Sequence, residues 1–221
     1  MRINPLDTMY ALDDLMAVCQ YQPDAIVVPK ATKEVIIAAD IILNILELRF
    51  GLLPQSVGMV ALVETALGVD SISAIAGASP RLIAVQFGAE DYTKDMEIVR
   101  SVASGEIVHS RNRLAIACRA YGIDCIDTPY LDFKDSEGYI RDTEYVKAIG
   151  MTGRCLIHPS LIESTNRIFS PSSDEIEEAN EIVTAYQEAV EKGMGAVALN
   201  GKMIDLPVYQ RALGILEKMR R

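Results

Sequence analysis

The chain has 221 residues, half of them hydrophobic and only 6% aromatic, and it contains no tryptophan. Its net charge of −10 argues against nucleic acid and anionic membranes as partners, because both are bound through clustered lysine and arginine. No stretch reaches the ~20 apolar residues of a membrane helix, and no signal-peptide pattern is present. The four cysteines show no metal-binding spacing, so we expect reduced thiols in a cytoplasmic protein.

Short apolar runs alternate with longer helical stretches over most of the chain. The runs are rich in Val, Ile, Leu and Ala without polar alternation, which is typical of strands buried on both faces. They cover residues 25–28, 58–63, 82–87, 123–127 and 154–157. Helices are expected between them, for example at 34–50, 71–76 and 104–121. This β-then-α order predicts a parallel sheet with covering helices.

The end of the chain has a different character. Ser173 or Asp174 is expected to begin a long helix that runs to about Lys192. A glycine-containing turn follows, and a last helix is expected from about Pro207 to Arg220. The sequence therefore predicts two parts, an α/β part at residues 1–170 and a helical extension at residues 171–221.

The number of strands leaves two architectures open. With a possible opening strand at Arg2 and Ile3, six strands are expected, whereas a closed (β/α)8 barrel has eight. The chain is then either an open doubly wound sheet or a barrel without its first two βα units.

Two acidic residues follow neighbouring apolar runs, where parallel α/β proteins place their functional groups. Glu64 comes directly after the second run, and Asp91 follows the third. Two carboxylates without a histidine beside them suit Mg²⁺, which prefers oxygen ligands and keeps several waters. The alternative is that Glu64 caps the next helix and Asp91 only turns the chain.

Other polar and small residues lie at the same predicted edge of the sheet. Arg2 and Lys30 are candidates to bind substrate carboxylates, unless they are ordinary surface charges. Asn4, Gly88 and Ala89 are predicted to contact substrate beside them, and Gly88 allows close approach of the backbone.

Two further segments carry polar residues. His158, at the end of the last run, is a candidate general base, although a lone histidine there is more often structural. Tyr130 and residues 132–137 are expected to form a surface loop.

Several short segments occur in a fixed order along the chain. They are R-I-N-P-L-D-T at 2–8, P-K at 29–30, V-E-T at 63–65, F-G-A-E-D-Y at 87–92, G-R-C-L-I-H-P at 153–159 and L-N-G-K-M-I-D at 199–205. This ordered set resembles the citrate-lyase-beta-like and malyl-CoA lyase family of the HpcH/HpaI aldolase superfamily. The resemblance covers essentially the whole chain, and the last segment is most similar to citrate lyase beta chains.

The resemblance implies a fold and a set of site residues. The fold is a (β/α)8 TIM barrel at residues 1–170, here without the first two βα units, and residues 171–221 carry a lid segment. Glu64 and Asp91 match magnesium ligands, and Arg2 matches a catalytic arginine that holds the oxo acid. Asp205 matches an acid–base residue that reaches into a neighbouring subunit, which implies a homo-oligomer, with a trimer expected.

The resemblance also implies an activity, the magnesium-dependent cleavage of a citryl thioester to an acetyl thioester and oxaloacetate. The acyl carrier is CoA or an acyl carrier protein, and the latter would bring citrate lyase alpha and gamma chains as partners. Four alternatives stay open: a malyl-CoA or citramalyl-CoA lyase, a Schiff-base aldolase that uses Lys30, an N-terminally truncated inactive subunit that only assembles with partners, and an unrelated α/β binding protein.

Overall fold

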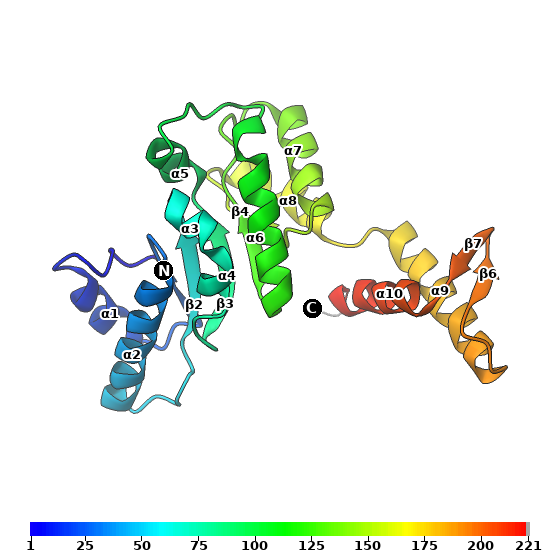
Figure 1. Ribbon diagram of the computed structural model, residues 1–221, viewed down its shortest axis with the longest axis horizontal. Helices are drawn as coiled ribbons and strands as arrows, with labels where there is room; N and C mark the ends of the chain where they lie inside the picture. The colour runs from blue at the N-terminus through cyan, green and yellow to red at the C-terminus, as the bar shows by residue number, and fades with distance from the viewer. Residues whose placement is uncertain (220–221) are drawn as a thin grey trace. The chain divides into compact units, whose positions relative to one another are not determined.

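The computed structural model describes residues 1–219, and these form the predicted α/β architecture (Figure 1). They divide into two compact units that meet in sequence at Ile162 and Glu163. The first unit carries one parallel sheet, with its strands side by side in chain order. The strands are β1 (Ala25–Val28), β2 (Gly58–Val63), β3 (Leu82–Phe87), β4 (Asp124–Asp127) and β5 (Gly153–Arg154).

The helices follow the strands as expected for βα units, and α6 packs against β3 and β4. The helices up to the unit boundary are α1 (Ala11–Cys19), α2 (Lys33–Phe50), α3 (Ala66–Asp70), α4 (Ile72–Ala76), α5 (Ala89–Asp95), α6 (Val108–Tyr121), α7 (Ser136–Ala148) and α8 (Ile162–Phe169). Short 3-10 turns, η1 (Gly105–Ile107) and η2 (Pro159–Leu161), precede α6 and α8.

The limits of β1, β2 and β3 are those predicted from the apolar runs, whereas β5 is shorter and ends at Arg154. The predicted opening strand is present as a bridge, in which Arg2 pairs in parallel with Val27. The described residues therefore supply six of the eight strand positions of a closed barrel, which agrees with the predicted incomplete (β/α)8 fold.

The prediction that the strands are buried on both faces is wrong for β1, for the first half of β2 and at Ile83 of β3, which is 50% exposed. Ile26, Val28 and Met59 are fully buried, but Val27 and Val60, which alternate with them, are only half-buried. Strands in this linear order do not close on themselves. Among the described residues, this second face is therefore not packed by opposite strands, as it would be in a closed barrel.

The prediction that Tyr130 lies in a surface loop is also wrong. Tyr130 is buried against Tyr139 and Leu161, and its hydroxyl donates a hydrogen bond to Asp135 Oδ2 over 3.0 Å. Asp135 is in turn the N-cap of α7, where its carboxylate accepts from the backbone N–H of Gly138 over 2.9 Å. The polar segment after Tyr130 thus forms the start of α7, and Tyr130 itself points into the core.

The second unit begins within α8 and contains α9 (Ser173–Glu191), a hairpin of β6 (Val197–Leu199) and β7 (Lys202–Ile204), and α10 (Leu206–Lys218). The N-cap of α9 is Ser172, one residue before the first of the two predicted candidates, Ser173 and Asp174, and it forms a capping box with Glu175. The predicted helix end at Arg220 lies outside the described residues.

The hairpin replaces the simple glycine turn expected from the sequence. Asn200 and Gly201 have φ values of 50° and 76°, as the two central residues of a type I′ turn require. Leu199 and Lys202 pair directly across that turn. In the part of the chain that the structure describes, no helix is both long enough and apolar enough to span a membrane.

Candidate active site

The carboxyl ends of β1, β2 and β3 bring together four of the residues singled out from the sequence: Arg2, Lys30, Glu64 and Asp91. Three of them, Lys30, Glu64 and Asp91, line one cavity of about 460 Å³. Arg2 is close enough for its positive charge to lower the pKa of Glu64. The predicted clustering at this edge of the sheet is therefore present in the structure.

Glu64 is held in place by the strand ends on both sides of it. The backbone N–H of Lys30 donates to Glu64 Oε1 over 2.9 Å, and the N–H of Gly88 bonds to the carbonyl of Val63 over 2.8 Å. A Cβ atom at Gly88 would lie 2.7 Å from Glu64 Cβ. Any larger residue at position 88 would displace the Glu64 side chain, which explains why a glycine follows β3 here.

Lys30 has an unusual backbone conformation for a residue with a side chain. Its φ is 49°, in the left-handed region that costs a non-glycine residue about 1–2 kcal/mol. The preceding Pro29 and this conformation together form the tight turn after β1, and that turn aims the Lys30 amide at Glu64. The Lys30 side chain is exposed beside the cavity.

The electrostatics of the pair are unbalanced. Glu64 is only 7% exposed, whereas Asp91, in the first turn of α5, is exposed. Burial raises the pKa of the Glu64 carboxyl, the Lys30 amide lowers it in part, and the charge of Asp91 raises it again. The site thus holds two carboxylates that repel each other, and a divalent cation between them would remove that repulsion.

The donor set fits Mg²⁺ better than a metal that requires a full protein cage. Among residues 1–219, no group of three or more His, Cys, Asp or Glu side chains is arranged to hold a metal. Glu64 and Asp91 would therefore supply two oxygen ligands and leave the other positions to water and substrate, as is usual for magnesium.

Four residues lining the cavity were not singled out from the sequence, Thr65, Lys94, Asp95 and Glu97, and two of them, Lys94 and Asp95, lie on the helix that carries Asp91. They lie three and four residues after Asp91 on α5, so helical spacing places them on the same face as that carboxylate. Asp95 also fixes the neighbouring helix, since its Oδ2 accepts from the backbone N–H of Ala66 over 2.7 Å. The spacing alone could have indicated both residues.

The predicted substrate contacts of Asn4, Gly88 and Ala89 remain predictions, and Asn4 and Ala89 have hydrogen-bond partners within the chain. The backbone and side-chain nitrogens of Asn4 both donate to Asp14 Oδ2 over 2.8 Å. The backbone N–H of Ala89 donates to Thr128 Oγ1 over 3.3 Å.

The two remaining candidates have local structural contacts. His158 stacks on Phe133 with ring centroids 4.7 Å apart, and its Nδ1 lies 2.8 Å from Ser160 Oγ. Asp205, in the second unit, is the N-cap of α10, where Oδ1 accepts from the backbone N–H of Val208 over 3.2 Å. The geometry favours the structural interpretation of His158.

A second group of charges lies at the ends of β4 and β5 and was not predicted as a group. Asp127, fully buried at the end of β4, accepts from Arg111 over 2.9 Å and from Arg154 over 2.7 Å. Both arginines also bond to Asp142 of α7. The charges of this group cancel, so it needs no ligand.

Comparison with known proteins shows the family to which the chain belongs. Residues 1–159 match the family model described as HpcH/HpaI aldolase/citrate lyase. The chain is 36% identical over 217 residues to the citrate lyase subunit beta of Leuconostoc mesenteroides subsp. cremoris, covering 98% of this chain and 72% of that one.

Two solved structures from Mycobacterium tuberculosis have the same fold. Protein CitE in complex with magnesium, acetoacetate and coenzyme A superposes with a TM-score of 0.78 at 27% identity, over 100% of this chain and 77% of that one. The citrate lyase beta subunit complexed with oxaloacetate and magnesium gives a TM-score of 0.65 at 27% identity, over 77% and 72%. The chain belongs to the HpcH/HpaI aldolase/citrate lyase family, as the ordered sequence segments indicated.

Proposed function

We propose that this protein is a magnesium-dependent carbon–carbon lyase that cleaves a citryl thioester into an acetyl thioester and oxaloacetate. The observation that carries the proposal is the carboxylate pair of Glu64 and Asp91 at the ends of β2 and β3, with Arg2 beside it. Relatives that bind magnesium with oxaloacetate or coenzyme A have the same fold and support this assignment.

Each residue of the cluster has a role that its position allows. Glu64 and Asp91 would hold Mg²⁺, which supplies a Lewis acid for a substrate carbonyl when it is bound. Arg2 would bind a carboxylate of the oxo acid through its two-pronged guanidinium group. Lys30 fixes Glu64 through its backbone amide, and its exposed ammonium would hold a second carboxylate.

The reaction requires two proton transfers. A base takes the proton of the tertiary hydroxyl of the citryl group as the carbon–carbon bond breaks, and the hydroxyl oxygen becomes the carbonyl oxygen of oxaloacetate. The electron pair of the broken bond passes to the acetyl thioester as an enolate, whose α-carbon then takes up a proton. We assign that second transfer to Asp205, on the basis of the sequence resemblance.

The assembly follows from the same resemblance. On that basis residues 1–170 would be the barrel part and residues 171–221 a lid segment, although the compact units of the structure meet earlier, at Ile162 and Glu163, and Asp205 would act in the site of a neighbouring subunit of a homotrimer. The carrier is CoA, or an acyl carrier protein in a complex with citrate lyase alpha and gamma chains. The four cysteines are free thiols, which supports a cytoplasmic location.

The decisive experiment is release of oxaloacetate from citryl-CoA, with and without Mg²⁺, by the wild type and Glu64→Gln. We expect magnesium-dependent release that falls by about a hundredfold or more in the variant, since a Lewis acid contributes several kcal/mol. Glu90→Gln is the matched control, because it removes one negative charge from α5 next to Asp91 but lies outside the cavity.

Other outcomes would redirect the assignment. Oxaloacetate release that needs no magnesium, together with a covalent enzyme–substrate adduct that borohydride traps, would favour a Schiff base on Lys30. Activity on malyl-CoA or citramalyl-CoA alone would change the substrate but keep the metal site. A folded protein that binds Mg²⁺ yet cleaves none of these thioesters would support an assembly subunit.

A further inference from the structure

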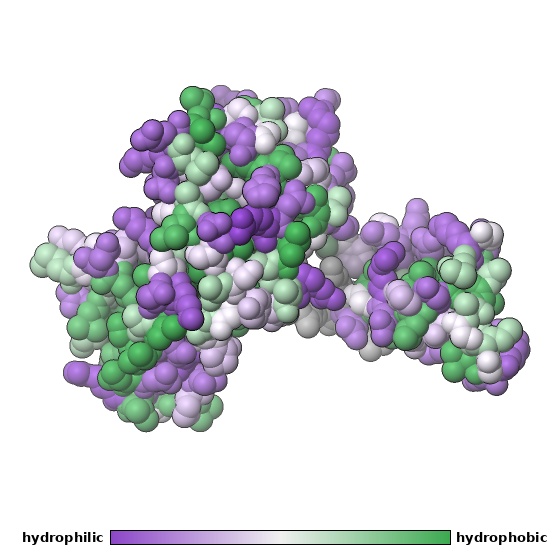
Figure 2. Space-filling view, viewed as in Figure 1, coloured by the Kyte–Doolittle hydropathy of each residue, from purple (hydrophilic) through white to green (hydrophobic). Residues whose placement is uncertain are grey.

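The helix α2 is apolar on both of its long faces. One face packs into the first unit through Ile36, Leu43 and Leu46, as expected for a helix that covers a sheet. The other face is exposed, and Figure 2 shows hydrophobic side chains gathered over the position of α2. Helices α1 and α4 contact α2 at its flanks and leave this outer face free.

The exposed apolar residues form a single line along the helix. Ile37, Ile41, Ile45 and Leu48 are 38%, 56%, 59% and 78% exposed. At 100° per residue, all four lie within about 40° of Ile41, over most of a helix about 27 Å long. Single exposed leucines are ordinary, but four aligned apolar side chains form a continuous strip of the kind found at interfaces.

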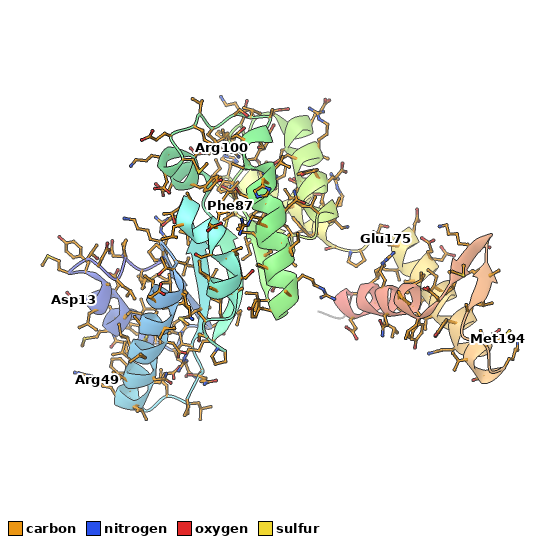
Figure 3. All side chains as sticks on the ribbon, in the orientation of Figure 1. Asp13, Arg49, Phe87, Arg100, Glu175 and Met194 are labelled. Atoms are coloured by element: carbon orange, nitrogen blue, oxygen red, sulfur yellow. The ribbon has the colours of Figure 1, made fainter. Side chains whose placement is uncertain are left out.

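The charges at the ends of this strip decide what fits it. Glu34 begins the exposed face, and Arg49, which Figure 3 labels near the end of α2, closes it. Helical geometry places both on the same side of the strip, about 20° and 80° from Ile41. Lys33 lies about 80° away on the opposite side.

This arrangement is complementary to itself when one copy is turned end to end. Two-fold symmetry with antiparallel helices sets Ile41 near the axis and places residues from the same side of each strip opposite one another. Glu34 of one copy then faces Arg49 of the other, twice. Lys33 faces no arginine, because it lies along the other side of the strip.

We propose that α2 is a self-association surface that binds a second copy of this chain, antiparallel and around a two-fold axis near Ile41. We expect a single helix pair to bury less than the ~800 Å² per partner of a standard interface. The dimer should therefore be weak and form mainly at high protein concentration. This surface is separate from Glu64 and Asp91, and it would double the mass of whatever assembly the chain otherwise forms.

A cysteine at the symmetry axis provides the first test. Ile41→Cys would lie next to its own copy, so mild oxidation should give a disulfide-linked dimer on a non-reducing gel. Ile116→Cys is the matched control, because Ile116 is 71% exposed on the outer side of α6. Equal cross-linking of the two variants would overturn the proposal.

Charge reversal tests the antiparallel geometry. Glu34→Arg and Arg49→Glu each place like charges opposite one another, and each alone should weaken self-association by about tenfold or more in sedimentation. An equal mixture of the two variants should recover the heavier species. In the mixed pair, the first variant carries arginine at both positions and the second carries glutamate at both, so opposite charges face each other at both contacts.

The outcomes are distinct from those of the lyase assay. A mixture that stays at the lower mass, or an Ile45→Asp variant that keeps the wild-type mass, would show that this face does not bind a second copy. Recovery in the mixture, with cross-linking at position 41 only, would establish the pairing even if citryl-CoA were not the substrate.

Discussion

Two groups of charged side chains lie at the carboxyl ends of the same sheet, and they differ in whether their buried charges are neutralised by partners within the chain. The group at β4 and β5 contains two arginines, Arg111 and Arg154, and two aspartates, Asp127 and Asp142. The group at β2 and β3 contains Glu64 and Asp91, with no arginine or lysine side chain bonded to either carboxylate among the described residues. Neighbouring strand ends therefore carry one neutral cluster and one acidic cluster.

The pKa values follow this difference. Burial opposes ionisation of Asp142, but hydrogen bonds from Arg111 and Arg154 outweigh it and lower the pKa of that carboxyl. Burial raises the pKa of Glu64, and its neighbour Asp91 raises it further. The neutral cluster is complete in the folded chain, whereas the acidic pair gains a favourable partner only when a cation binds.

The largest effect is expected when the neutral cluster is broken. Asp127→Asn should lower the free energy of unfolding by about 3–5 kcal/mol, because it leaves two buried guanidinium groups with one carboxylate. Glu64→Gln should leave stability unchanged or raise it, since Gln keeps the bond from Lys30 and removes the repulsion of Asp91. Urea unfolding followed by circular dichroism measures both.

A loss of stability in Glu64→Gln as large as that in Asp127→Asn would contradict the distinction between the two groups. Arg113→Gln is a useful control. It removes a charge from α6, where the pair with Asp70 is exposed, and should change stability by less than about 1 kcal/mol.

The sheet was predictable because buried parallel strands appear in the sequence as short, continuous apolar runs. The apolar runs gave the limits of β1, β2 and β3 to the residue. The helices α1, α3, α5, α7 and α8 were not predicted, although Thr65 and Asp135 cap the starts of α3 and α7 with their side chains. Tyr130 was predicted at the surface because its polar neighbours are visible in the sequence and its buried partners, Tyr139 and Leu161, are distant along it.

The candidate site was predictable in part for a related reason. Glu64 follows β2 directly, and Lys30 and Asp91 come within a few residues of the ends of β1 and β3, so the order of the strands brings the three together. Arg111 and Asp142 come from α6 and α7, and their approach to the strand ends depends on how each helix is rotated against the sheet. Side-chain packing sets that rotation, and the residues at the strand ends do not indicate it.

The backbone of Lys30 offers a sharper test of the acidic pair. Lys30→Gly should raise the free energy of unfolding by about 0.5–1 kcal/mol, because relief of left-handed strain exceeds the added flexibility of the unfolded chain. Lyase activity should fall by about 10–100-fold, through loss of the charge beside the cavity. Lys30→Ala separates the two effects, since it should lose activity without gaining stability.

A third carboxylate, Glu106, lies in the segment between α5 and α6. Burial opposes its ionisation, but bonds from the backbone N–H and hydroxyl of Ser101 and from Arg100, labelled in Figure 3, lower its pKa to about 2. Because the folded pKa lies below the ordinary 4.5, the stabilisation is complete above pH 4.5 and is lost as the pH falls toward 2. The stability difference between wild type and Glu106→Gln should therefore shrink by about 1 kcal/mol between pH 5 and pH 2. A difference that stays constant with pH would mean that a carboxylate paired with arginine at this surface gains nothing from its charge, and the contrast between neutral and acidic groups would then hold only for the buried strand ends.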